Sequence, residues 1–182
     1  MKKMGAMLLA GALAVCGGAA HAETRFNGYV GISYAELEQY DRFFATGRYE
    51  TGELFVRLGG HLNEIFTSEL RIGTTINDVS SSTAPRGVSK YRHDYIVSMM
   101  LQAGHQVGIF RPYVGVGYSY VRERLRLTNG DDVTGSFDDM SVAGGLDIHI
   151  TDQLGVNLEY TQYYDTDNLR LKGPSAGVIW RF

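Results

Sequence analysis

Apolar and polar side chains alternate along most of this chain. Between residues 174 and 182, apolar side chains at even positions alternate with mixed ones at odd positions, and the run ends at Phe182. Successive side chains of a β-strand point to opposite faces, so a period of two predicts strands. Eight such segments are present, at residues 26–34, 50–59, 66–75, 91–102, 111–122, 137–150, 155–164 and 174–182. Each is long enough to supply the ~9–11 residues with which a tilted strand crosses a bilayer.

The segments between these predicted strands alternate in length. Three are short, at 60–65, 103–110 and 151–154, and four are longer and polar, at 36–49, 76–90, 124–136 and 165–172. Short turns on one side and longer loops on the other are the pattern of an outer-membrane barrel. Because the number of strands is even, we expect both termini on the short-turn side, which would be the periplasmic side.

Aromatic residues gather at the ends of the predicted strands. Near the short turns lie Phe26, Phe66, Phe110, Trp180 and Phe182, and near the long loops lie Tyr34, Tyr91, Tyr118, Tyr120, Tyr163 and Tyr164. Amphipathic rings favour the level of the lipid headgroups, so two aromatic belts around an apolar band indicate a membrane barrel. A soluble β-sandwich is the alternative, but it gives no reason to sort aromatic residues by strand end.

The first 22 residues predict a cleaved signal peptide. Lys2 and Lys3 precede an apolar stretch at 7–15, and Ala20-His21-Ala22 fits a small-x-small cleavage site. The stretch is shorter than the ~20 residues of a transmembrane helix. We therefore expect a signal peptide at 1–22 and a barrel domain at 23–182.

The predicted mature chain is acidic and has no cysteine. The single cysteine, Cys16, lies in the signal segment, and Val15 before it is bulky for the cleavage site of a lipoprotein. Removing Lys2 and Lys3 from the 17 basic residues leaves 15 against 20 acidic ones, a net charge of −5. This balance gives no basic surface for nucleic acid. We expect no nucleic-acid partner and no cofactor.

The chain resembles the small eight-stranded OmpA- and OmpX-type barrels of the bacterial outer membrane. The resemblance rests on the signal segment, on the related stretches at 26–31 and 113–118, and on the terminal Trp180-Arg181-Phe182. It implies an all-β, eight-stranded antiparallel up-and-down transmembrane barrel in which Trp180 and Phe182 form the C-terminal assembly signal. The implied partners are outer-membrane lipids and lipopolysaccharide, the barrel-assembly machinery, periplasmic chaperones and an extracellular ligand of the outer loops.

Charged side chains of both signs fall on the predicted inward face. They are Glu53, Arg57, Glu69, Arg71, Arg92, Asp94, Asp147, Glu159 and Arg181. Eight strands leave an interior just wide enough for side chains to fill, and an unpaired buried charge is costly. We predict that these charges form ion pairs that close the lumen. The alternative is a narrow channel for ions or small solutes.

Arg122, Arg124 and Arg126 form a basic stripe at the long-loop end of the fifth predicted strand. Guanidinium groups suit phosphate geometry, so we expect contact with lipopolysaccharide phosphates. Pairing with loop acids such as Asp131 and Asp132 is the alternative reading of the stripe.

The histidines do not predict an enzyme or a metal centre. Among His61, His93, His105 and His149, only His93 lies toward the long loops, and its neighbour Asp94 has the opposite facing. The spacing supports neither a Ser-His-acid site nor a zinc site. We therefore expect a structural or surface-interaction role, in envelope integrity, adhesion or ligand binding. A channel and a lipid A-modifying enzyme are the alternatives.

Overall fold

The computed structural model describes residues 28–41, 47–77, 79–80, 88–166 and 169–182. The predicted signal peptide and Phe26 lie outside these residues. Eight long strands form the fold: β1 (Gly28–Asp41), β2 (Gly47–His61), β3 (Phe66–Asn77), β5 (Val88–Gly104), β6 (Phe110–Leu127), β7 (Asp132–His149), β8 (Leu154–Thr166) and β9 (Leu169–Arg181). A two-residue strand, β4 (Val79–Ser80), pairs with β5.

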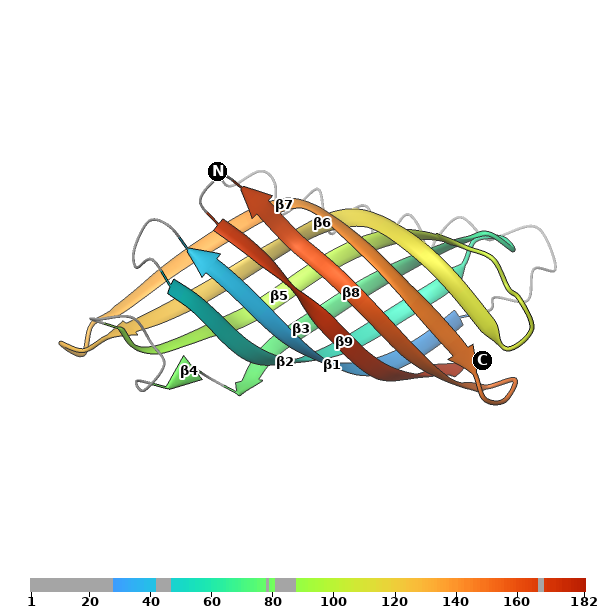
Figure 1. The fold of residues 1–182 in the computed structure, drawn as a ribbon, viewed down its shortest axis with the longest axis horizontal. Helices are drawn as coiled ribbons and strands as arrows, with labels where there is room; N and C mark the ends of the chain where they lie inside the picture. The colour runs from blue at the N-terminus through green and yellow to red at the C-terminus, as the bar shows by residue number, and fades with distance from the viewer. Residues whose placement is uncertain (1–27, 42–46, 78, 81–87, 167–168) are drawn as a thin grey trace.

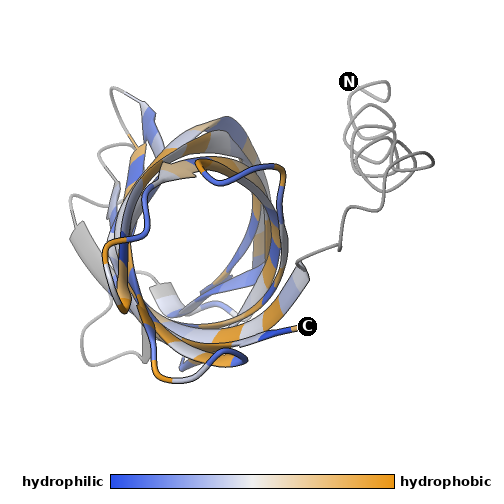
Figure 2. Ribbon diagram, turned by 90° about the vertical axis from the view of Figure 1, so that its right-hand side faces the viewer, coloured by the Kyte–Doolittle hydropathy of each residue, from blue (hydrophilic) through white to orange (hydrophobic). Residues whose placement is uncertain are grey.

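The long strands close into an antiparallel barrel. Each pairs with its neighbour in sequence, and the β1–β9 and β3–β5 pairings complete the ring. In Figure 2, the strands encircle the barrel axis and apolar residues alternate with polar ones along them. Closure pairs the edges that an open sheet would leave exposed. The predicted eight-stranded up-and-down barrel is therefore confirmed.

The two ends of the barrel differ. One end of the barrel, which we call the short-turn end, carries the turns between β2 and β3, between β5 and β6, and between β7 and β8. Strand β9 also finishes at this end (Figure 1). At the other end, here the hairpin end, the β6–β7 hairpin projects furthest (Figure 1). The two ends give the reference frame for every site below.

The strands are longer than predicted, and the expected loops at 36–49 and 124–136 consist largely of strand. Strands β6 and β7 have 18 residues each and are joined only by residues 128–131. Gly130 in this turn has φ of +93°, a conformation that glycine adopts without the usual steric cost. Polar residues on both faces were interpreted as loop, although a paired hairpin surrounded by water tolerates them equally well.

The outward face of the barrel is apolar and the inward face is largely polar. Val114 and Met140 are each 67% exposed, whereas Ser98 and Glu53 are buried at 0%. Soluble proteins show the reverse arrangement, and an exposed apolar band of this kind is what a lipid environment selects. Among the described residues, none belongs to a helix long and apolar enough to cross a membrane.

The pairing register shifts at four places near the hairpin end, and two of these β-bulges alter the facing of side chains discussed here. The β5–β6 register shifts between His93 and Tyr95, and the β8–β9 register shifts between Gln162 and Tyr164. A bulge inserts an extra residue and so interrupts the simple alternation. The facing read from the sequence is therefore wrong beyond each bulge.

The bulges change the predicted aromatic belts. Tyr91, Tyr163 and Tyr164 are buried inside the barrel rather than facing lipid. Tyr163 in any case shares the inward parity of Thr161, which the sequence interpretation overlooked. Elsewhere the aromatic side chains face outward as expected: Tyr34 near the hairpin end, and Phe66, Phe110, Trp180 and Phe182 near the short turns.

Candidate functional site

The inward side chains form three layers along the barrel axis. Successive inward positions of β2 show their order from the short-turn end: Arg57, then Phe55, then Glu53. Arg57 belongs to a layer of ion pairs, Phe55 to an apolar cluster, and Glu53 to a second polar layer centred on His93. We call these the ion-pair layer, the apolar septum and the His93 layer.

The ion-pair layer joins two arginines and two glutamates, all buried. Arg57 Nη2 lies 2.9 Å from Glu69 Oε2. Arg71 binds Glu159 through two parallel contacts of 2.6 and 2.7 Å and also contacts Glu69. The Tyr113 hydroxyl donates to Glu159 at 2.5 Å. Bidentate, charge-assisted contacts of this kind are among the strongest in proteins, and the four charges cancel.

A further ion pair lies closer to the short turns. Arg111 Nη1 is 3.1 Å from Asp147 Oδ2, and Asn157 donates to the other oxygen of Asp147 at 2.7 Å. The sequence interpretation missed Arg111, although it shares the inward parity of Tyr113. Arg181, predicted to join the lumen charges, instead lies at the mouth, where its Nη1 is 3.0 Å from His149 Nδ1.

The apolar septum separates the two polar layers. It consists of Ala35, Leu37, Phe55, Ile96, Val121, Tyr163, Tyr164 and Leu171. The rings of Phe55 and Tyr163 stack with centroids 5.6 Å apart. This cluster was not predicted, because only charged side chains were considered on the inward face, although Phe55 shares the parity of Glu53 and Arg57.

The His93 layer occupies the lumen on the hairpin side of the septum. His93 Nδ1 lies 2.8 Å from Glu53 Oε1, and His93 Nε2 lies 3.0 Å from the Tyr91 hydroxyl. Glu123 accepts hydrogen bonds from Tyr91 at 2.6 Å and from Gln39 at 3.0 Å. His93 was expected to face outward, and the bulge after it turns its side chain into the barrel.

The same bulge places Arg92 and Asp94 on the outer wall, so the prediction that they belong to the lumen was wrong. Asp94 Oδ2 is 2.8 Å from Arg124 Nη2, and Asp94 Oδ1 is 3.4 Å from Arg92 Nε. Since Asp94 is the extra residue of the bulge, it shares the outward facing of Tyr95.

The outward face of β6 carries the predicted basic stripe of Arg122, Arg124 and Arg126. Two basic residues of β5 lie beside it, since Arg92 pairs with Arg124 and Lys90 pairs with Arg126. We call these five residues the basic wall. A shallow hollow of about 220 Å³ lies between Lys90, Arg92, Arg124, Arg126 and Asp132. Asp132 is 3.3 Å from Arg126. The contribution of β5 could not be read from the sequence, because it depends on the bulge at Asp94.

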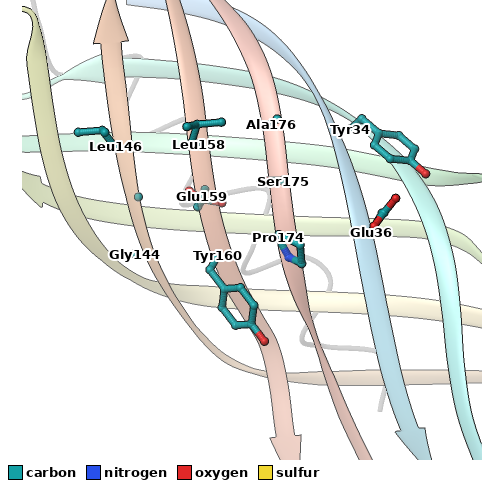
Figure 3. Close-up of a pocket in the computed structure, with 11 residues that line it drawn as sticks. Tyr34, Glu36, Gly144, Leu146, Leu158, Glu159, Tyr160, Pro174, Ser175 and Ala176 are labelled. Atoms are coloured by element: carbon teal, nitrogen blue, oxygen red, sulfur yellow. The ribbon is translucent and has the colours of Figure 1, made fainter.

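A second, apolar hollow crosses the outward faces of β7, β8, β9 and β1. Its volume is about 680 Å³. Gly144, Pro174 and Ala176 form its low floor, and Leu158 and Tyr160 stand beside it (Figure 3). Small side chains thus make a groove in the apolar surface.

At the end of β9, Trp180 and Phe182 are both exposed. The Phe182 amide donates to the Gly28 carbonyl at 3.0 Å, which ties the terminal residue to the start of β1. Phe182 is thus held to β1 through its backbone, while its side chain is 69% exposed.

The described residues contain no group of three or more histidine, cysteine, aspartate or glutamate side chains placed to hold a metal ion. The side-chain partners of His93 are carboxylate, phenol and amide groups. No serine hydroxyl contacts its ring in the part of the chain that the structure describes.

Solved structures show the same fold at low sequence identity. Neisserial surface protein A matches with a TM-score of 0.68 and 17% identity, covering 85% of this chain and 97% of that one. Ail, the attachment invasion locus protein of Yersinia pestis, matches at 0.65 and 11%, covering 86% and 99%. The N-terminal β-barrel domain of Pseudomonas aeruginosa OprF matches at 0.61 and 15%, covering 87% and 100%.

The sequence comparison gives the family. No curated protein sequence matches this chain significantly. The profile of the family described as "Outer membrane protein beta-barrel domain" matches residues 7–182, nearly the whole chain. Together with the closed eight-stranded barrel and its apolar outer face, this match shows that the chain belongs to the outer membrane protein β-barrel domain family.

Proposed function

We propose that this protein is a non-conducting, non-catalytic barrel of the outer membrane that acts through its surface, in envelope integrity or in binding a ligand outside the cell. The distribution of charge carries this proposal. Inside, the ion-pair layer balances its own charges and the septum packs aliphatic and aromatic side chains across the lumen. Outside, the described ion pairs of the five basic residues are made with two carboxylates, Asp94 and Asp132. The charge available to a lipid or an extracellular partner is therefore on the outer wall.

The proposed orientation places the short-turn end in the periplasm and the hairpin end outside the cell. Short periplasmic turns and longer external hairpins are usual in this class of barrel. The C-terminus would then be periplasmic (Figure 1), as would the N-terminal end of β1. In this position Trp180 and Phe182 would be presented to the periplasmic chaperones and the barrel-assembly machinery.

The proposed ligand of the basic wall is the phosphate of lipopolysaccharide. In the proposed orientation the wall lies just beyond Tyr118 and Tyr120 on β6, at the level where lipid phosphates meet water. Each Lys or Arg close to an anionic membrane surface contributes about 1 kcal/mol. A relative with the same fold supports a polyanionic ligand, since Ail has been solved in complex with the heparin analogue sucrose octasulfate.

The double variant Arg124→Gln/Arg126→Gln tests this assignment. Binding of lipid A carrying two phosphates would be compared with binding of dephosphorylated lipid A, using protein refolded in phosphatidylcholine nanodiscs. We expect the variant to bind the phosphorylated form roughly 10- to 100-fold more weakly than the wild type, at about 1 kcal/mol per arginine. Arg170→Gln, an exposed arginine on β9, is the matched control.

Equal affinity of the wild type and the double variant would contradict the proposed site. An equal loss in Arg170→Gln would also contradict it, because the effect would then be one of net charge and not of the wall.

A further inference from the structure

The two polar layers of the lumen differ in charge balance. Arg57 and Arg71 balance Glu69 and Glu159 in the ion-pair layer. The His93 layer contains two buried carboxylates, Glu53 and Glu123, whose described side-chain partners include no arginine or lysine. The apolar septum lies between this layer and the arginines. The described contacts of Glu53 and Glu123 therefore include no arginine or lysine that could balance their charge.

His93 is the titratable base among the described side-chain contacts of this layer. Its Nδ1 faces Glu53 Oε1 at 2.8 Å, and a carboxylate only accepts. Its Nε2 faces the Tyr91 hydroxyl at 3.0 Å and Gln39 Oε1 at 3.2 Å.

Both neighbours of Nε2 act as acceptors. Gln39 uses its Nε2 to donate to Glu123, so its Oε1 faces His93. The single Tyr91 proton has Glu123 and Gln39 oxygens as acceptors. Both ring nitrogens of His93 thus face oxygen atoms, and a doubly protonated ring supplies at most one positive charge to the two carboxylates.

At least one of the two carboxylate charges then has no positive partner among the described contacts, and two oxygens of this layer are without a hydrogen-bond partner. Glu53 Oε2 and Thr51 Oγ1 are buried and have no hydrogen-bond partner within the described structure. The two residues occupy consecutive inward positions of β2, and their exposures are 0% and 4%. A buried carboxylate oxygen without a donor or a cation is strongly destabilising. A cation bound to the free oxygen would therefore stabilise the buried Glu53 carboxylate.

We propose that the His93 layer binds one small monovalent cation, with Glu53 Oε2 and Thr51 Oγ1 as ligands. Oxygen ligands suit hard cations. Calcium takes six to eight oxygens, commonly from several carboxylates, and the described residues hold no such metal cluster. A singly charged cation such as sodium or potassium matches one free carboxylate oxygen and one hydroxyl at consecutive inward positions of β2.

Glu53→Gln tests the site, because it removes the charge and keeps the shape. The control is Glu50→Gln, which removes an exposed carboxylate from the same strand. Unfolding of the refolded barrel would be followed in sodium, potassium and N-methylglucamine chloride at equal ionic strength, so that screening is the same. N-methylglucamine is too large for the site.

We expect the wild type and Glu50→Gln to be more stable in sodium or potassium than in N-methylglucamine. A salt concentration of ten times Kd changes the unfolding equilibrium constant about 11-fold. Glu53→Gln should lose this difference. If Glu53→Gln fails to fold, Thr51→Val removes the other ligand without removing charge, and it should reduce the difference.

Two results would overturn the proposal. Equal stability of the wild type in all three salts would mean that water and not a cation occupies the site. A sodium or potassium effect that persists unchanged in Glu53→Gln and Thr51→Val would place the cation elsewhere.

Discussion

Burial determines what each charged residue contributes in this barrel. Glu69 is 2% exposed and contacts Arg57, Arg71 and the Tyr29 hydroxyl. Arg170 of β9, by contrast, pairs with Asp165 at 2.8 Å on the exposed outer surface of the barrel. An exposed ion pair of this kind contributes at most about 1 kcal/mol. The same type of contact is therefore essential inside the barrel and of minor importance outside it.

Replacing Glu69 with alanine should destabilise the barrel by about 3–5 kcal/mol, because it leaves Arg57 and Arg71 with one carboxylate between them. Urea unfolding in lipid vesicles, followed by gel mobility, measures the change. Glu64→Ala in an exposed turn is the control and should change stability by less than about 0.5 kcal/mol. If Glu69→Ala costs no more than this control, the ion-pair layer does not stabilise the fold.

Arginine in place of valine should be costly only in the lipid-facing band. Val116 is 53% exposed in the middle of β6, whereas Val133 is 45% exposed in the projecting β6–β7 hairpin. We expect Val116→Arg to cost about 2–4 kcal/mol and Val133→Arg about 0–1 kcal/mol. Equal unfolding free energies for the two variants in bilayers would show that the band is not set by lipid.

Single-residue facing could largely be predicted, and the exceptions have a physical cause. The alternation placed Arg57, Glu69, Arg71 and Glu159 inside the barrel, and the structure brings these four together. It could not reveal which acid meets which base, since this depends on how the strands are staggered around the barrel.

At the scale of strands, the β-bulges in β5 and β8 are features that could not be predicted from the sequence. The bulge in β5 brings His93 into the lumen and adds Arg92 to the basic wall, and the bulge beside Tyr164 contributes to the septum. A bulge requires only one extra residue, and no residue type at these two positions predicts it. The composition of the His93 layer and of the basic wall was therefore beyond sequence reasoning.

The strand lengths were underestimated for a related reason. Polar residues in β1, β2, β6 and β7 near the hairpin end were interpreted as loops. Pairing satisfies the backbone whether the side chains are polar or apolar. Hydropathy alone therefore marks where a strand leaves the bilayer and not where the strand ends.

Strand β9 provides a test of the terminal assembly signal. The Phe182 side chain is 69% exposed, so Phe182→Ala removes little internal packing. Ile179→Val alters a side chain that is 4% exposed and should cost about 0.5–1.5 kcal/mol in stability. We nevertheless expect Phe182→Ala to reduce assembly into the outer membrane several-fold more than Ile179→Val does. Equal amounts of folded protein in membrane fractions would contradict a signalling role for Phe182.

At the scale of the whole molecule, the barrel has an apolar outer face and an interior of ion pairs and packed apolar side chains. The fold class was predictable because alternation, turn lengths and the aromatic side chains near the short turns all agree. The layered interior was not, because it combines inward apolar residues with charges from distant strands. The septum in particular adds a cluster of packed apolar groups to the ion pairs that the sequence predicted.

The central claim is that the ion-pair layer and the septum close the lumen. Planar-bilayer recording of the refolded wild-type protein tests this claim most directly. We predict no steady open state, because Arg71 and Glu159 bridge the interior and Phe55 and Tyr163 stack beyond them. Phe55→Ala, which shortens a septum side chain, should produce more frequent openings under the same conditions. A large and stable conductance in the wild-type protein would contradict the account and would identify the barrel as a pore.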